Sequence, residues 1–146
     1  MSETFRAYQL LIEYRKLEQH DFGGLYIIPH MNDLYIWHGV YFIRLGVHAG
    51  RILRFYIQIP KDYPDNEVKL HLLVPHKSIP KLKNNSITLL LQKLIETCDN
   101  LEFDNDFEAK SELNLYEPIP PLNPIEFSPL TEEEYQHLRS LVFDNQ

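Results

Sequence analysis

The sequence predicts an α+β domain in which helices cover one face of an antiparallel sheet. Helically spaced apolar residues occur near both ends of the chain, and between them lie four runs rich in β-branched and aromatic residues. At 146 residues, with 44% hydrophobic and 12% aromatic residues, the chain is long and apolar enough to bury one core. We therefore expect a single domain spanning residues 1–146.

The first element is predicted to be an amphipathic helix from Thr4 to about Gln19. Its apolar residues recur at helical spacing, with Glu, Arg and Lys between them. These residues are Ala7, Leu10, Leu11, Tyr14 and Leu17. Asp21 and the paired glycines that follow interrupt the pattern, which indicates a turn from helix into sheet.

Four strands are predicted next, joined by short links into an antiparallel meander. The runs are Leu25–Ile28, Leu34–Arg44, Ile52–Ile59 and Val68–Val74. In the third run, apolar residues alternate strictly with more polar ones, which places the two sets on opposite faces of the sheet. The first set is Leu53, Phe55, Ile57 and Ile59, and the second is Arg54, Tyr56 and Gln58. One face of the sheet therefore needs a cover.

A second, more buried helix is predicted from Ile87 to about Cys98, and it can provide that cover. The polar residues Asn84, Asn85 and Ser86 precede it and are suited to cap its first turn.

The C-terminal part is predicted to be an extended strap followed by a last helix. Residues 116–129 contain five of the ten prolines, which cannot continue a helix or a central strand. Thr131 followed by Glu134 is a capping-box sequence, which predicts a helix over residues 131–143.

Composition excludes several classes of function. The formal net charge of −7 and the scattered basic residues argue against direct binding of nucleic acid or of an anionic membrane. The sequence contains no leader pattern and no stretch of 18 apolar residues, so we expect a cytosolic or nuclear location. The single cysteine excludes an internal disulfide, and the nearest histidine pair, His71 and His76, has no third ligand at a recognised spacing. No metal and no cofactor are therefore expected.

The central sequence resembles that of ubiquitin-conjugating enzymes. The stretch WHGVYFIRLGVHAGRILRFYIQIPKDYP, from Trp37 to Pro64, contains their Trp-x-Gly pattern, a glycine-bearing hairpin, an aromatic-rich strand and a Pro-x-x-Tyr-Pro turn. The longer segment Gly24–Asp65 is similar to the fused-toes, or AKT-interacting protein, family of conjugating-enzyme variants. The FSP sequence at Phe127–Pro129 also resembles that family, whereas Lys83–Glu117 does not align with it. The resemblance implies the ubiquitin-conjugating-enzyme fold.

The resemblance also locates a degenerate active site. A conjugating enzyme needs a cysteine thiolate to carry ubiquitin and an upstream His-Pro-Asn motif that stabilises the oxyanion. The matching positions are His76, Lys77 and Ser78 for the motif, and Ser86, Ile87 or Thr88 for the cysteine. A serine or threonine hydroxyl is a poor substitute, because it holds its proton far more tightly than a thiol does. Cys98 lies about ten residues too late and is expected to be a packing residue, so we expect a protein that is not an enzyme.

The resemblance implies that the chain is a non-catalytic adaptor. It would bind the coiled-coil end of a Hook protein together with a fused-toes-and-Hook-interacting protein, and so link vesicular or endosomal cargo to dynein on microtubules. Three alternatives stay open: a noncovalent ubiquitin-binding cofactor of an active conjugating enzyme, a chromosome-end protection factor, and a conjugating enzyme with an unusual nucleophile. The candidate partner-binding stripe is Tyr135, Leu138, Leu141 and Val142. The competing interpretation of that stripe is that it packs back on the domain.

Overall fold

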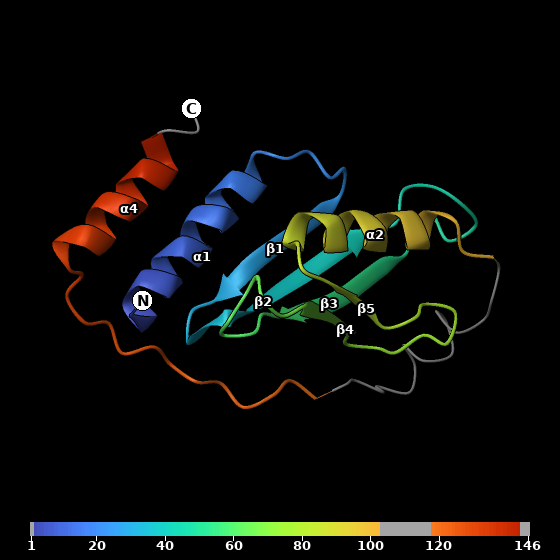
Figure 1. Cartoon of the computed structure of the whole chain (residues 1–146). Helices are drawn as coiled ribbons and strands as arrows, with labels where there is room; N and C mark the ends of the chain where they lie inside the picture. Colours follow the sequence, from blue (N-terminus) through green and yellow to red (C-terminus); the bar gives the residue numbers. More distant parts are fainter. Residues whose placement is uncertain (1, 103–117, 144–146) are drawn as a thin grey trace.

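A computed structural model of the chain describes residues 2–102 and 118–143. It has the predicted α+β architecture, with α1 and α2 on one face of an antiparallel sheet and α4 beside α1 (Figure 1). The elements are α1 (Glu3–Glu18), β1 (Leu25–His30), β2 (Asp33–Phe42), β3 (Ile52–Gln58), β4 (Val68–Leu72), β5 (Leu82–Asn84), α2 (Ile87–Asp99) and α4 (Glu132–Phe143). The predicted helices and the first four strands are confirmed to within a few residues at their ends.

The sheet has five strands, in the order β1-β2-β3-β4-β5, so the prediction of four strands was incomplete. β5 pairs antiparallel with β4, with Leu70 opposite Leu82 and Val68 opposite Asn84. A strand of three residues is too short to produce an alternating pattern, so β5 could not be predicted from hydrophobic periodicity.

The core lies between the sheet and the two helices α1 and α2. The third strand behaves as its alternation predicts, with Phe55 and Ile57 fully buried, and α2 contributes Leu91 and Leu94 from the opposite side. Burying side chains of this size is the main stabilising contribution to such a fold.

The Trp-x-Gly pattern in β2 has a packing explanation. The Trp37 side chain is fully buried, its ring is 5.5 Å from that of Tyr14 on α1, and its indole N–H donates to the Leu34 carbonyl at 2.8 Å. Gly39 pairs with Phe55 across the strands, and a Cβ at position 39 would lie 2.3 Å from the Phe55 ring. Gly39 therefore leaves the space that the Phe55 ring occupies.

Two turns attach the helices to the sheet. In the Pro-x-x-Tyr-Pro turn, the Tyr63 hydroxyl donates to the Glu13 carboxylate on α1 at 2.5 Å. In the β2–β3 hairpin, Gly46 has a φ of +84°, and a Cβ there would lie 2.5 Å from the Asp99 carbonyl at the end of α2. Only glycine permits both this backbone conformation and this close approach to Asp99. The Tyr41 hydroxyl also donates to the Asp99 carboxylate, at 2.7 Å.

The outer face of the sheet is partly covered by the proline-rich strap, of which residues 118–129 are described. The Tyr56 hydroxyl contacts the Pro118 carbonyl at 3.4 Å, and the Asn123 N–H donates to the buried Asp33 carboxylate at 3.0 Å. Tyr56 was predicted on the outer, more polar face. It lies on that face but is buried, because the His71 ring stacks on it at 4.8 Å and the strap contacts its hydroxyl.

Phe42 lies on the outer face of the sheet and not in the core. Its side chain is 42% exposed and packs edge-to-face with Tyr26 at 6.1 Å. It shares its face of β2 with His38 and Val40.

Candidate functional site

The positions expected to form a degenerate active site serve to fold the chain locally. Ser86 is the N-cap of α2, and its hydroxyl accepts the Leu89 N–H at 3.3 Å. Ile87 is buried in the core, and Thr88 is half-buried in the first turn of the helix. These residues begin a helix, and the hydroxyl at the cap position is already used as a hydrogen-bond acceptor.

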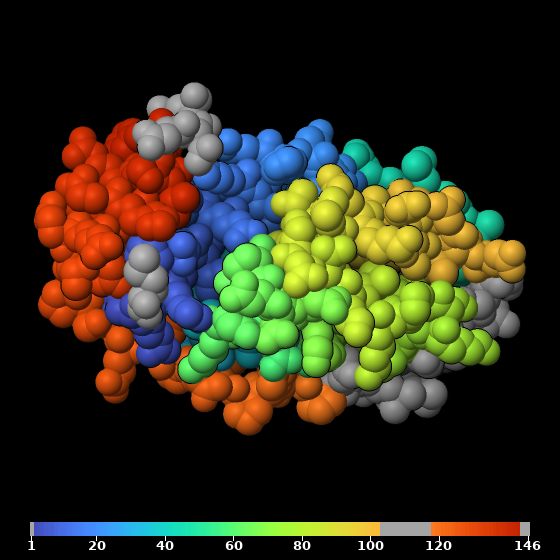
Figure 2. All heavy atoms as spheres, viewed as in Figure 1, coloured from blue at the N-terminus to red at the C-terminus, as the bar shows by residue number. Residues whose placement is uncertain are grey.

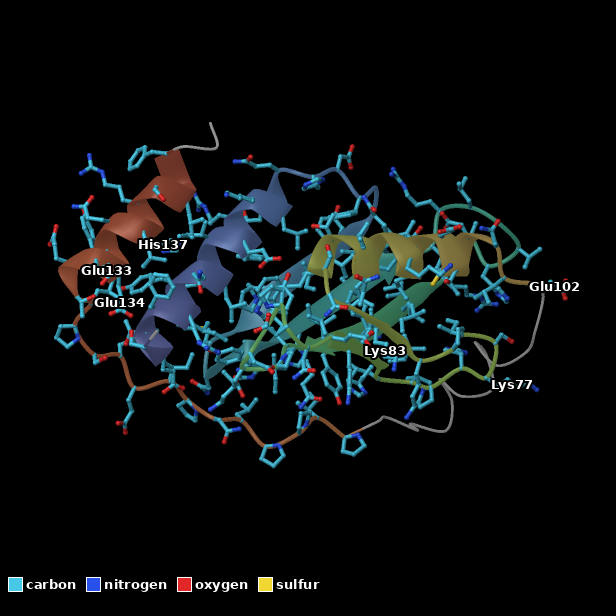
Figure 3. The ribbon with its side chains drawn as sticks, viewed as in Figure 1. Lys77, Lys83, Glu102, Glu133, Glu134 and His137 are labelled. Atoms are coloured by element: carbon cyan, nitrogen blue, oxygen red, sulfur yellow. The ribbon has the colours of Figure 1, made fainter. Side chains whose placement is uncertain are left out.

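The structure does not gather the upstream motif and these positions into one pocket. His76 is buried in the loop after β4, whereas Lys77 and Ser78 are exposed; Figure 3 shows Lys77 at the end of the molecule. The cavity beside His76 has a volume of about 120 Å³. Its lining residues are Leu70, His71, Leu72, Pro75, His76, Ile79, Pro80 and Lys81. Neither Ser86 nor Thr88 lines this cavity.

Cys98 is a packing residue, as predicted. Its side chain is fully buried in the last turn of α2, within the core cluster. Burial, with a smaller contribution from the neighbouring Asp99 carboxylate, raises the pKa of the Cys98 thiol to about 12. A thiol in this position is shielded from solvent and is protonated at neutral pH.

Two further expectations concern metals and membranes. Within residues 2–102 and 118–143, no group of three or more His, Cys, Asp or Glu side chains could hold a metal ion. Among the helices described, none is long and apolar enough to cross a bilayer.

The predicted capping box at the start of α4 is present and extends to α1. The Glu134 N–H donates to the Thr131 hydroxyl at 3.1 Å, and the Thr131 N–H donates to the Glu134 carboxylate at 3.2 Å. The same carboxylate accepts the backbone N–H and the hydroxyl of Ser2, the N-cap residue of α1. These hydrogen bonds, led by that of the Ser2 hydroxyl, lower the pKa of Glu134 to about 2.

The FSP sequence forms a second attachment between the strap and α1. The Ser128 N–H donates to the Thr4 hydroxyl oxygen at 2.7 Å, and the two hydroxyls are 3.1 Å apart. Phe127 packs edge-to-face against Tyr8 at 6.0 Å. Together with the contact between Phe5 and His137 at 5.2 Å, these interactions fix α4 alongside α1. Figure 3 shows Glu134 and His137 on the side of α4 that faces α1.

The predicted partner-binding stripe is divided between two environments. Leu138 is 6% exposed and Leu141 is half-buried, so this half of the stripe packs on the domain. Tyr135 is 51% exposed and Val142 is 41% exposed. Tyr135 and Val142 are seven residues apart, which places them on one outward face of α4.

Val142 borders a groove that runs along the outward side of α1, which we call the α1–α4 groove. It has a volume of about 610 Å³. Its lining residues are Tyr8, Leu11, Ile12, Arg15, Lys16, Gln19 and Val142. Figure 2 shows α4 (red) packed against α1 (blue) at one end of the molecule. The groove combines an apolar wall with two cationic side chains.

The comparisons with known proteins show a similarity to one group of relatives. A crossbronx homologue of Culex quinquefasciatus is 32% identical over 66 residues, 45% of this chain and 29% of that relative. An AKTIP homologue of Nematostella vectensis is 35% identical over 63 residues, 43% of this chain and 21% of that relative. A crossbronx-like protein of Drosophila mojavensis is 40% identical over 60 residues, 41% of this chain and 23% of that relative. The chain is thus similar, over 41–45% of its own length, to crossbronx and AKTIP proteins, the fused-toes family.

The similarity to this fused-toes family covers only part of each protein. The matched segments span less than a third of the length of these curated relatives. No protein-family model matches the chain.

The contribution of α1 to the groove was not predicted from the sequence. The run Leu10-Leu11-Ile12 carried the signal, because three consecutive apolar residues in a helix cannot all face one core. Leu10 is buried, whereas Leu11 and Ile12 are half-buried and line the groove. A second apolar face on α1 was therefore readable in the sequence.

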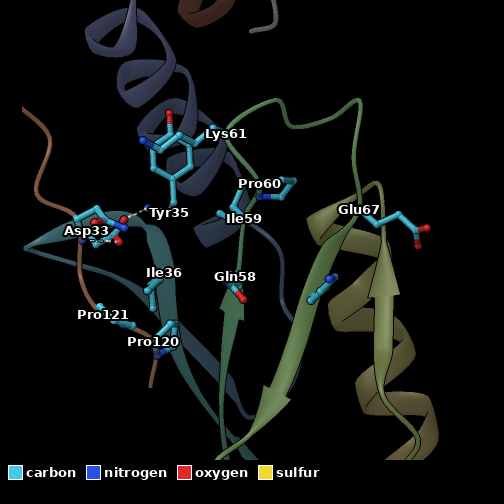
Figure 4. Close-up of a pocket in the computed structure, with 12 residues that line it drawn as sticks. Asp33, Tyr35, Ile36, Gln58, Ile59, Pro60, Lys61, Glu67, Pro120 and Pro121 are labelled. Carbon is cyan, nitrogen blue, oxygen red and sulfur yellow. Dashed lines mark hydrogen bonds between the residues drawn. The ribbon is translucent and has the colours of Figure 1, made fainter. Parts of the chain in front are cut away.

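A second cavity, of about 340 Å³, lies beneath the strap (Figure 4). Tyr35 and Ile59 at strand ends and Pro120 and Pro121 of the strap contribute to its lining. The buried Asp33 carboxylate in its wall accepts the N–H groups of Tyr35 and Asn123, each at 3.0 Å, so this group holds the strap in place.

Proposed function

We propose that the chain is a non-catalytic adaptor of the fused-toes type that holds a helical segment of a Hook-family protein in the α1–α4 groove. A fused-toes-and-Hook-interacting protein would join the same assembly in the cytoplasm and link vesicular or endosomal cargo to dynein-based transport. The fold is, in this proposal, a variant of the ubiquitin-conjugating-enzyme fold.

The observation that carries the proposal is the apolar wall of the α1–α4 groove. Leu11 and Ile12 on α1 and Val142 on α4 leave apolar surface uncovered on two helices that are fixed side by side. Grooves of this kind hold the apolar face of an amphipathic helix, and coiled-coil ends present such faces. α1 has 16 residues and is about 24 Å long, enough to contact roughly four turns of a partner helix.

The absence of a reactive cysteine supports an adaptor over an enzyme. The expected nucleophile positions begin α2, with the Ser86 hydroxyl capping the helix. Cys98 is buried and its thiol pKa is raised. A protein with this arrangement acts through its surface.

Binding to a purified C-terminal coiled-coil segment of a Hook protein, measured by titration calorimetry, tests the proposal. We expect Val142→Glu to raise Kd at least about tenfold, because a carboxylate replaces an apolar contact in the groove. Leu89→Glu is the matched control, since Leu89 is an exposed helical residue of α2 that does not line the groove. Equal affinity of Val142→Glu and the wild type, with both proteins folded, would contradict the proposal.

One observation favours the alternative of a noncovalent ubiquitin cofactor. The outer face of the sheet exposes apolar side chains from three neighbouring strands, at Tyr26, Ile28, Phe42 and Ile52. Exposed apolar clusters of this kind are typical of protein-binding surfaces. NMR titration of the ¹⁵N-labelled protein with unlabelled ubiquitin tests this alternative. Changes in amide chemical shift that are confined to β1 and β2, and that disappear in Ile28→Glu, would support it. Recovery of telomere proteins with the chain from cell extracts would instead favour the chromosome-end alternative.

A further inference from the structure

The α1–α4 groove differs in charge from the rest of the molecule. The chain has a formal net charge of −7, yet the charged residues that line the groove are Arg15 and Lys16. Both are exposed and lie in the last turn of α1, beside Val142 at the C-terminal end of α4.

The acidic residues nearest to these cations in sequence do not line the groove. The Glu13 carboxylate accepts the Tyr63 hydroxyl at 2.5 Å, on the side of α1 that faces the Pro-x-x-Tyr-Pro turn, although it also interacts electrostatically with Lys16. Glu18 lies near Tyr14, whose ring packs against Trp37 in the core. The charged side chains in the groove lining are therefore both cationic, although glutamates flank Arg15 and Lys16 along the helix.

We infer that the segment held in the α1–α4 groove is an amphipathic helix whose apolar stripe is bordered by acidic residues facing Arg15 and Lys16. This inference rests on the proposed function of the groove as a helix-binding site. An acidic helix is repelled by most of the negatively charged surface and attracted by the groove. Complementary charges of this kind raise the association rate and direct a partner to one place.

Arg15 and Lys16 also have a local role that does not depend on a partner. Cations in the last turn of a helix interact favourably with its dipole, so they stabilise α1 even without a partner. A purely local role predicts no preference between acidic and basic partners, whereas the proposed role predicts a strong one.

Two synthetic helical peptides test the inference on the full chain. They share one leucine stripe and differ only in its flanks, which are Glu in one peptide and Lys in the other. We expect the Glu peptide to bind at least about tenfold more tightly, to lose affinity as salt is raised, and to shift the amide signals of Ile12 and Val142.

The double substitution Arg15→Glu/Lys16→Glu should reverse the peptide preference. Lys83→Glu/Lys93→Glu is the matched control, because it changes the net charge equally at exposed positions on β5 and α2 and should keep the preference. Arg15→Gln/Lys16→Gln should abolish the preference without placing new negative charge at the end of α1. These three variants separate an effect of the groove from an effect of net charge or of folding.

The outcomes distinguish this inference from the proposed function. Equal binding of both peptides, binding of neither, or an unchanged preference after Arg15→Glu/Lys16→Glu overturns the acidic-helix inference. If Val142→Glu lost Hook binding while the wild type bound both peptides equally, the groove would be the Hook site but its occupant would not be selected by acidic residues. If the chain preferred the Glu peptide but did not bind the Hook segment, the groove would select an acidic helix, and the Hook protein would not be its partner.

Discussion

The carboxylate of Glu134 accepts both the backbone N–H and the hydroxyl of Ser2, at 3.0 and 2.5 Å. The Ser2 hydroxyl in turn accepts the Phe5 N–H at 3.1 Å, as the cap of α1, while Glu134 completes the capping box of α4 with Thr131. One buried side chain therefore satisfies donors at the starts of two helices that are far apart in sequence.

Glu134→Gln is expected to lower the thermal midpoint and to weaken its dependence on acid pH. The hydrogen bonds lower the pKa of Glu134 from its ordinary value of 4.5 to about 2, so the folded state favours the ionised form. The stabilising contribution is fully present above about pH 4.5 and is lost as the pH falls toward 2. The difference in melting temperature between wild type and variant should therefore shrink as the pH falls from about 4.5 to about 2.

Glu133→Gln provides the control for that experiment, because Glu133 is the exposed neighbour in the same helical turn. If Glu134→Gln and Glu133→Gln gave the same change in melting temperature with pH, the shared cap would not be the cause.

Substitutions in the C-terminal stripe should separate its packing half from its exposed half. Leu138→Ala is expected to reduce the free energy of unfolding by about 2–5 kcal/mol, because it removes a buried side chain between α4 and the domain. Tyr135→Ala removes a side chain that is 51% exposed, and it should change the free energy of unfolding by about 0.5 kcal/mol or less. Urea denaturation measures both values. A Leu138→Ala protein as stable as the wild type would show that α4 does not pack on α1 in solution.

Gly39 and Phe55 are expected to behave as a coupled pair. Gly39→Ala should destabilise the protein by about 1–3 kcal/mol, because the new Cβ meets the Phe55 ring at 2.3 Å. Phe55→Leu should relieve that overlap, so the double variant should be more stable than the sum of the single effects implies. A double-mutant cycle from denaturant curves measures the coupling, and strict additivity would contradict the contact. Phe55→Ala alone is expected to destabilise by about 3–5 kcal/mol.

No reducible ubiquitin adduct is expected when the protein is incubated with activating enzyme, ATP and ubiquitin. Cys98 is buried in α2 and its thiol pKa is raised to about 12, so little thiolate is present at neutral pH. A thiol reagent should accordingly label Cys98 slowly in the native protein and rapidly in urea. A ubiquitin band that is removed by reductant and absent in Cys98→Ser would overturn the non-catalytic interpretation.

The elements with a periodic pattern were predictable from the sequence, and the contacts between distant segments were not. The alternation in β3 and the capping box at Thr131 each predict a local structure, and both are present. The burial of Tyr56 depends on the strap, more than 60 residues later, so no local pattern could predict it. The three residues of β5 escaped detection because pairing with β4, and not their own sequence, makes them a strand.

The candidate site was predictable only in part. The stripe on α4 was visible in the sequence, but its division between Leu138 and Val142 is decided by where α1 lies. The capping role of Ser86 was predicted from the polar residues before the second helix and is confirmed, because its hydroxyl accepts the Leu89 N–H.

The contact between Ser2 and Glu134 joins residues 132 positions apart, which bears on the order in which the chain folds. During synthesis α1 emerges before the strap and α4 that pack beside it. Contacts of such long sequence separation form late, because a large loop must close first. A partner that recognises α1 and α4 together would therefore engage the chain only after both helices have been synthesised and have packed side by side.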